Sequence, residues 1–170
     1  MDRNHILRAA LVGAGLAFVG TAAHAATATT TFQVTATVTA SCDVSATDLN
    51  FGNYDTVVGT AVDGTSTITA TCTLDTPYDI GLDTGANGAS ATGTTRAMSD
   101  GAATPTYLDY ELYSDTTRTT LWGNDVGTDT VPVAAATGTA ETYTVYGQIA
   151  ASQNVPAGNY TDTINVTITY

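Results

Sequence analysis

The segment from Ala26 to Cys42 constrains the fold more than any other part of the chain, because its side chains alternate strictly in character. Gln, Thr and Ser occupy one parity from position 33 to position 41. The other parity is apolar and comprises Phe32, Val34, Ala36, Val38, Ala40 and Cys42. A period of two is that of a β-strand with one face to bury. We therefore expect a single extended strand over this segment.

This strand contains no residue that readily turns a chain. Between Ala26 and Cys42 there is no Gly, Pro, Asn or Asp, so a hairpin with its own continuation is disfavoured. At about 3.3 Å per residue the segment would span roughly 55 Å, about three times a usual strand. An unpaired strand with an apolar face promotes aggregation unless it completes the sheet of another molecule. We expect part of the segment to project beyond its domain and to pair in that way.

Residues 1–25 have the pattern of an export signal. Arg3 and Arg8 are basic, an apolar stretch follows from position 9 to position 20, and Ala23-His24-Ala25 has the small-x-small pattern of a cleavage site. The apolar stretch is too short to cross a bilayer. Cleavage after residue 25 would leave 145 of the 170 residues, a length that favours one exported domain.

The composition after cleavage excludes several functions. Arg96 and Arg118 stand against fifteen acidic residues, a net charge of −13, with no Lys and no His. A cationic patch for nucleic acid cannot be built, and anionic membranes are disfavoured. Catalysis through His or Lys and imidazole metal sites are also excluded. Carboxylate-pair catalysis could draw on Glu111, Glu141 and many aspartates, but no spacing marks any pair, so we expect neither an enzyme nor a cofactor.

One stretch partly matches a calcium-binding loop. Asp83, Asn87 and Gly88 have the spacing of the first, fifth and sixth positions of an EF-hand loop. However, Gly85 stands at the third position, Thr94 stands where the twelfth-position Glu belongs, and no helices are expected on either side. The interpretation that we favour is a turn rich in Gly and Asn.

Two cysteines in an exported chain favour one disulfide. Cys42 and Cys72 both lie on the apolar parity of their segments, so each is expected to point into a core. A Cys42–Cys72 bond would close a loop of about thirty residues, worth about 3.5 kcal/mol in the chain-entropy model. Two free thiols are the alternative.

Further short alternating segments follow at intervals bounded by turns. We expect strand character at residues 47–54, 65–75, 78–82, 107–113, 131–136, 142–149 and 160–170. Residues 85–103 are expected to form a low-complexity loop. Trp122 is expected to cap one end of the core, with ligand stacking as the alternative. The pattern predicts an all-β, antiparallel sandwich of immunoglobulin type.

Several short motifs together resemble the spore coat protein U domain family. This family includes the major pilins of the archaic chaperone-usher pili of Gram-negative bacteria. The likeness covers essentially the whole chain after the signal, and its last motif is the most specific. The motifs are Cys42-Asp-Val44, Leu49-Asn-Phe51-Gly-Asn-Tyr54-Asp55, Tyr110-Glu-Leu112-Tyr113, Leu121-Trp122-Gly123, Tyr146-Gly147 and the run from Pro156-Ala-Gly158-Asn-Tyr160 to Tyr170.

The resemblance implies an incomplete immunoglobulin-like sandwich that lacks its last strand and leaves a hydrophobic groove. A periplasmic chaperone would fill the groove in transit, and at the outer-membrane usher the N-terminal segment of the next subunit would replace it. The domains would be residues 1–25 (signal), 26–40 (donor strand) and 41–170 (pilin domain). The donated side chains would be Phe32, Val34, Ala36 and Val38. The groove and chaperone edge would comprise Ile164, Val166, Ile168 and Tyr170.

The implied function is that of a structural subunit in a surface pilus, a homopolymer exported through the periplasm to the cell surface and supporting adhesion or biofilm formation. One alternative is a spore coat or matrix protein. The other is an adhesin that binds a ligand through its loops, which is ranked lower because 145 residues leave no room for a separate receptor domain.

Overall fold

The structure is a computed structural model that describes residues 24–90 and 95–170. By its internal contacts the chain divides into two units, Met1–Ala36 and Thr37–Tyr170. Every strand among the described residues lies in the second unit. The predicted export signal falls almost wholly outside the described residues. No helix within residues 24–90 and 95–170 is long and apolar enough to cross a membrane.

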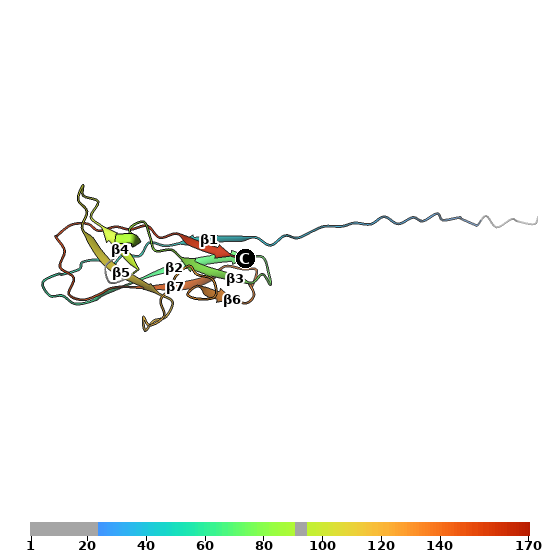
Figure 1. Cartoon of the computed structure of the whole chain (residues 1–170). Helices are drawn as coiled ribbons and strands as arrows, with labels where there is room; N and C mark the ends of the chain where they lie inside the picture. The colour runs from blue at the N-terminus through green and yellow to red at the C-terminus, as the bar shows by residue number, and fades with distance from the viewer. Residues whose placement is uncertain (1–23, 91–94) are drawn as a thin grey trace, which may run out of the picture. The chain divides into compact units, whose positions relative to one another are not determined.

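The larger sheet has five strands (Figure 1). Its strand order is β1-β2-β7-β5-β4, and every pair that it contains is antiparallel. β2 and β7 form the long centre of the sheet, whereas β1 and β4 are its edges. The strands are β1 (Cys42–Ala46), β2 (Val62–Cys72), β4 (Arg96–Ser99), β5 (Tyr107–Tyr113) and β7 (Glu141–Ile149).

The smaller sheet has the order β6-β3-β8, again antiparallel. β3 (Tyr78–Leu82) is its centre, and β6 (Val131–Val133) and β8 (Val166–Thr169) are its edges. Pro132, which cannot donate to a ladder, lies on the edge strand β6, as the sequence predicts. One 3-10 turn, Gly88–Ser90, precedes β4. The expected all-β antiparallel sandwich is thus confirmed.

Inward-facing residues of both sheets form one core. The largest members include Ile68, Ile80, Leu82 and Ile149, each at most 2% exposed. Trp122 is 1% exposed, and its indole N–H donates to the carbonyl oxygen of Ile80 at 2.8 Å. This confirms that the tryptophan belongs to the core, because its ring packs against protein and its polar atom is satisfied.

The expectation of a low-complexity loop over residues 85–103 is wrong in part. β4 lies inside this stretch, and Arg96 and Ala97 are 2% and 0% exposed. The Arg96 guanidinium donates to the carbonyl oxygens of Asp83 (2.9 Å), Leu82 (3.0 Å) and Trp122 (2.6 Å). The composition of this stretch did not predict a strand, because β4 is held by ladder hydrogen bonds to β5 and by the buried Arg96 guanidinium, not by a run of apolar residues.

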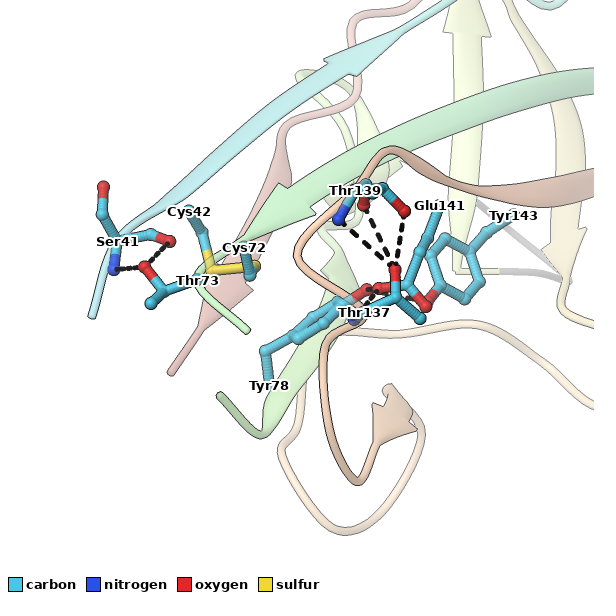
Figure 2. Close-up of a disulfide and its surroundings, with 9 residues drawn as sticks. All are labelled: Ser41, Cys42, Cys72, Thr73, Tyr78, Thr137, Thr139, Glu141 and Tyr143. Atoms are coloured by element: carbon cyan, nitrogen blue, oxygen red, sulfur yellow. Dashed lines mark hydrogen bonds between the residues drawn. A yellow bond between two sulfur atoms is a disulfide. The ribbon is translucent and has the colours of Figure 1, made fainter. Parts of the chain in front are cut away.

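The predicted disulfide is confirmed. Cys42 and Cys72 are register partners on β1 and β2 and are bonded to each other. Figure 2 shows the bond next to Ser41 and Thr73, whose backbones continue the pairing through a Thr73 N–H to Ser41 oxygen bond of 2.9 Å. The bond ties the first residue of the sandwich to the end of its longest strand.

The expected strand over Ala26 to Cys42 is absent in the isolated chain. Strand structure begins only at Cys42, and residues 24–41 form no strand. A strand needs a ladder partner for its backbone groups. The alternation therefore indicates a segment that can form a strand, but only when another strand pairs with its backbone.

Candidate functional site

Two unpaired strand edges face the same side of the sandwich. β1 ends the larger sheet and β8 ends the smaller one, so each has neighbours on one side only among the described strands. The two strands approach within 8 Å between Cα atoms, but no ladder joins them. Open edges of this kind accept a further strand.

A groove continues from these edges. One wall is the segment 46–56, which follows β1, and the other is the segment 155–166, which leads into β8. The groove consists of two adjoining hollows of about 600 and 790 Å³, which share Leu49, Phe51, Met98 and Tyr160 as lining residues. Its floor is the core itself, through Ile68, Leu82, Leu108, Tyr110, Leu112, Val145 and Ile149.

The groove floor is nevertheless covered in the isolated chain. Its side chains are at most 5% exposed, because Leu49 and Phe51 of the wall lean over the strands. They rest on Gly64 of β2 and Gly147 of β7, which are register partners. A Cβ on Gly147 would lie 2.8 Å from both Leu49 Cδ1 and Phe51 Cζ. The two glycines thus provide the space in which the wall packs.

The hydrogen bonding of β8 shows which backbone groups are free for a new strand. The N–H of Asp83 donates to the Asn165 carbonyl oxygen, so Asn165 faces β3. In an antiparallel ladder bonded and non-bonded pairs alternate, and Val166 pairs with Leu82 in the next position. Leu82 directs its own N–H to Gly123 on the opposite side. Val166 and, two residues on, Ile168 therefore turn their N–H and C=O groups to the open edge.

Carboxylates fix the wall that leads into β8. Burial alone would raise the pKa of the Asp83 carboxyl, but hydrogen bonds from Asn165 and from the Gly85 N–H outweigh it and hold the pKa below its ordinary value. Asp162 accepts the phenol of Tyr110 at 2.8 Å. Burial, then this hydrogen bond, raises the pKa of Tyr110. The wall is thereby tied to β3 and β5.

The calcium candidate has a structural explanation in the same contacts. Both oxygens of Asp83 accept hydrogen bonds, Oδ1 from the N–H groups of Gly85 and Asn165 and Oδ2 from the Asn165 amide. Gly85 has a φ of +77°, which suits a turn. Within residues 24–90 and 95–170 no three His, Cys, Asp or Glu side chains group closely enough to hold a metal ion.

The structure places the predicted groove residues in two locations. Ile164 and Val166 line the groove, and Ile168 packs against the core beside them. Tyr170 is 60% exposed and lines a different hollow with Pro77 and Pro132. The predicted donor side chains are exposed in the isolated chain, with Phe32 at 87%, Val34 at 81% and Val38 at 84%; Ala36 is exposed as well.

Sequence reasoning missed the wall opposite β8. The signals were present, since Leu49 and Phe51 share one parity and Gly64 and Gly147 interrupt two strands. A glycine inside a strand often marks a place where other atoms approach closely. What the sequence could not show is that these four residues meet.

Comparisons with known proteins agree with this geometry. The family described as Spore Coat Protein U domain matches residues 28–167. "Protein U" of Myxococcus xanthus is 39% identical over 160 residues, covering 87% of this chain and 88% of that protein. A solved chain from the CsuC–CsuE chaperone–tip adhesion subunit pre-assembly complex of the archaic chaperone-usher Csu pili of Acinetobacter baumannii matches with 25% identity and a TM-score of 0.57. That match covers 79% of this chain and only 41% of the other.

Proposed function

The chain belongs to the Spore Coat Protein U domain family, and from this membership we propose that it is a structural subunit of a surface pilus that polymerises by donor-strand complementation. The observation that carries the proposal is the groove floored by core residues that continues from two open strand edges. The same chain has an uncharged segment with one apolar face and no ladder partner of its own. The groove offers backbone groups without a partner strand, and the segment is a strand-like sequence without a ladder partner.

In this proposal residues 26–40 of one copy enter the groove of another. Phe32, Val34, Ala36 and Val38 face the groove floor, while the backbone of the donor pairs with β8. Val166 and Ile168 offer the free N–H and C=O groups, and Ile164 forms part of the wall. Leu49 and Phe51 must move aside for the donor, because they cover the floor in the isolated chain.

A chaperone is the second partner of the groove. One structural relative is from a complex of a chaperone with a tip adhesion subunit before assembly. By that likeness we assign the groove and the β8 edge to a periplasmic chaperone during transit, and the exchange to an outer-membrane usher. The finished homopolymer then stands on the cell surface, where it supports adhesion or biofilm formation.

Deleting residues 26–38 tests the proposal. The shortened chain should still fold and be captured by its chaperone, because the groove is intact, but it should form no fibres. A triple serine variant at Phe32, Val34 and Val38 should behave in the same way. Its matched control replaces Thr35, Thr37 and Thr39 by serine, which changes only the polar parity and should leave assembly intact.

Electron microscopy and size-exclusion chromatography measure the outcome. Fibres formed by the deleted chain would overturn the proposal, as would equal loss of assembly in both triple variants. A stable monomer in which the chain's own residues 26–40 fill the groove would also overturn it.

A coat or matrix role is the second candidate, favoured by the family description and by the 39% identity to Protein U. It uses the same joint between copies and differs in where the polymer is deposited. Immunogold labelling distinguishes the two roles, since a pilus subunit is found in thin fibres that leave the cell and a coat protein in a continuous layer.

A further inference from the structure

An apolar turn at one end of the sandwich has no role in the groove itself. Val57 and Val58 are 94% and 66% exposed. The turn is held firmly, because Asp55 Oδ1 accepts the N–H groups of Val57 (2.8 Å) and Val58 (3.0 Å), and the Gly59 N–H donates to the Asp55 carbonyl oxygen at 2.9 Å. Gly59 adopts a φ of +65° and its oxygen accepts the N–H of Ser152. We call Val57 and Val58 the knob.

A shallow apolar hollow of about 550 Å³ lies among the ends of the smaller sheet. It forms where β3 and β6 pair and where β8 ends. Tyr170, 60% exposed, forms one side of it. We call it the hollow. It is lined by Pro77, Tyr78, Asp79, Pro132, Val133, Ala134, Thr169 and Tyr170.

The knob and the hollow lie at opposite ends of the sandwich. The knob shortly precedes β2, and the hollow shortly follows the far end of that strand, whose 11 residues span roughly 36 Å. Figure 1 shows the loop around residues 50–60 and the C-terminus at the two ends. The chain enters the sandwich at Cys42, the register partner of Cys72, and therefore at the hollow end.

The groove opens beside the knob. Tyr54, Asp55 and Thr56, immediately before the knob, line the wider of its two parts. A donor segment whose C-terminal end leaves the groove there brings the hollow end of the donor copy to the knob end of the acceptor. In the reverse direction, the hollow end of the donor copy would meet the hollow end of the acceptor copy. The acceptor's own N-terminal segment joins its sandwich at that same end.

We propose that the knob of one copy seats in the hollow of the copy whose N-terminal segment fills its groove. This inference rests on the proposed function and adds a second contact to the joint. Because knob and hollow are different surfaces, the contact is heterologous and repeats from copy to copy along an open polymer. Two exposed valines and two exposed prolines are then covered only in the assembled state.

Cysteine pairs test this contact in fibres of the full chain. Both native cysteines are in the disulfide, so Val58→Cys combined with Ala134→Cys adds the only free thiols; mass spectrometry verifies that the native bond is retained. After mild oxidation, fibres should give a ladder of covalent oligomers in denaturing gels. The matched control combines Ala134→Cys with Val126→Cys, a valine that is 57% exposed and belongs to neither surface; it should give no ladder.

A second measurement uses Val58→Cys alone. Its thiol should react with a maleimide at least tenfold more slowly in fibres than in the monomer. Fibres that form normally without a specific ladder, or a knob thiol that stays reactive in them, would overturn the inference and leave the proposed function standing. Dimers through two Val58→Cys residues would overturn it too. If the chain with residues 26–38 deleted still polymerises, the proposed function itself fails.

Discussion

At the scale of single residues, the pair Gly64 and Gly147 decides whether the groove wall can pack. Both lie inside long strands, where glycine is ordinarily unfavourable. Their missing side chains admit Leu49 and Phe51, which otherwise would have no place over the sheet. The packing of Leu49 and Phe51 on the sheet therefore depends on glycine at positions 64 and 147.

Gly147→Ala should destabilise the chain by about 1 to 3 kcal/mol, because the new methyl would overlap Leu49 and Phe51 at 2.8 Å. Urea unfolding followed by tryptophan fluorescence measures the loss. The control is Gly158→Ala, where the nearest atom, Cε2 of Tyr160, lies at 3.7 Å, and where a change within about 1 kcal/mol is expected. Equal effects of both substitutions would contradict the assigned contact.

Tyr110 should make the sandwich sensitive to alkali. Burial, then its hydrogen bond to Asp162, raises the pKa of the phenol in the folded chain, while the unfolded pKa stays near 10. Below pH 10 both states hold the proton, so stability is unaffected; above it the unfolded state loses the proton first and stability falls as pH rises.

Tyr110→Phe removes this titration together with the bond to Asp162. The variant should be less stable near neutral pH but should lose stability less steeply between pH 10 and pH 11.5. Chemical unfolding at several pH values in this range gives both slopes. Parallel slopes in the two proteins would show that Tyr110 does not carry the alkaline loss.

At the scale of elements, alternate residues of β8 direct their backbone groups to opposite sides of the strand. Thr167 of β8 pairs with Gly81 of β3, and Asn165, just before β8, accepts the N–H of Asp83, whereas the Val166 and Ile168 backbones face the open edge. Proline lacks the N–H but tolerates an edge position. Val166→Pro should therefore leave the fold intact at a loss of roughly 1 to 3 kcal/mol, yet prevent a donor strand from pairing.

The measurement for Val166→Pro is binding of a synthetic peptide with the sequence of residues 26–40 to a chain lacking residues 26–38. Val166→Thr keeps the backbone N–H and a β-branched side chain, so it serves as the control and should retain binding. Equal binding by the proline variant would place the donor on another edge.

How far the sequence predicts elements depends on where their partners lie. The segments at 78–82, 107–113 and 142–149 were predicted closely, because each alternates and is paired within the same chain. β4 was missed because its burial depends on Arg96, whose charge is paired with the Glu111 carboxylate at 3.5 Å and whose N–H groups donate to three carbonyl oxygens. The alternation at 26–42 was read correctly as a pattern, but it needs a partner to become a strand.

At the scale of the whole molecule, the sequence predicted the sandwich and the disulfide, and of the residues expected at the groove, Ile164 and Val166 line it, whereas Tyr170 does not. The other wall was predicted wrongly as a strand, because residues 47–54 alternate in sequence but form no strand, and Leu49 and Phe51 take their position from contacts with Gly64 and Gly147. The knob and the hollow could not be predicted from the sequence either, because exposed valines and prolines are common on protein surfaces. Only the fold shows that the two surfaces lie at opposite ends of the sandwich.

Net charge should control how fast the copies join. After removal of the signal each copy carries −13, yet residues 26–41 are uncharged and the first acidic side chain is Asp43. Repulsion therefore acts between sandwich bodies and not between donor segment and groove. Because the screening length falls from about 30 Å at 0.01 M salt to about 8 Å at 0.15 M, assembly should accelerate on the order of tenfold over that range. Light scattering measures the rate, and sucrose at matched osmolality controls for effects other than screening. A rate that falls with salt would mean that opposite charges, and not the apolar knob, hollow and donor segment, bring the copies together.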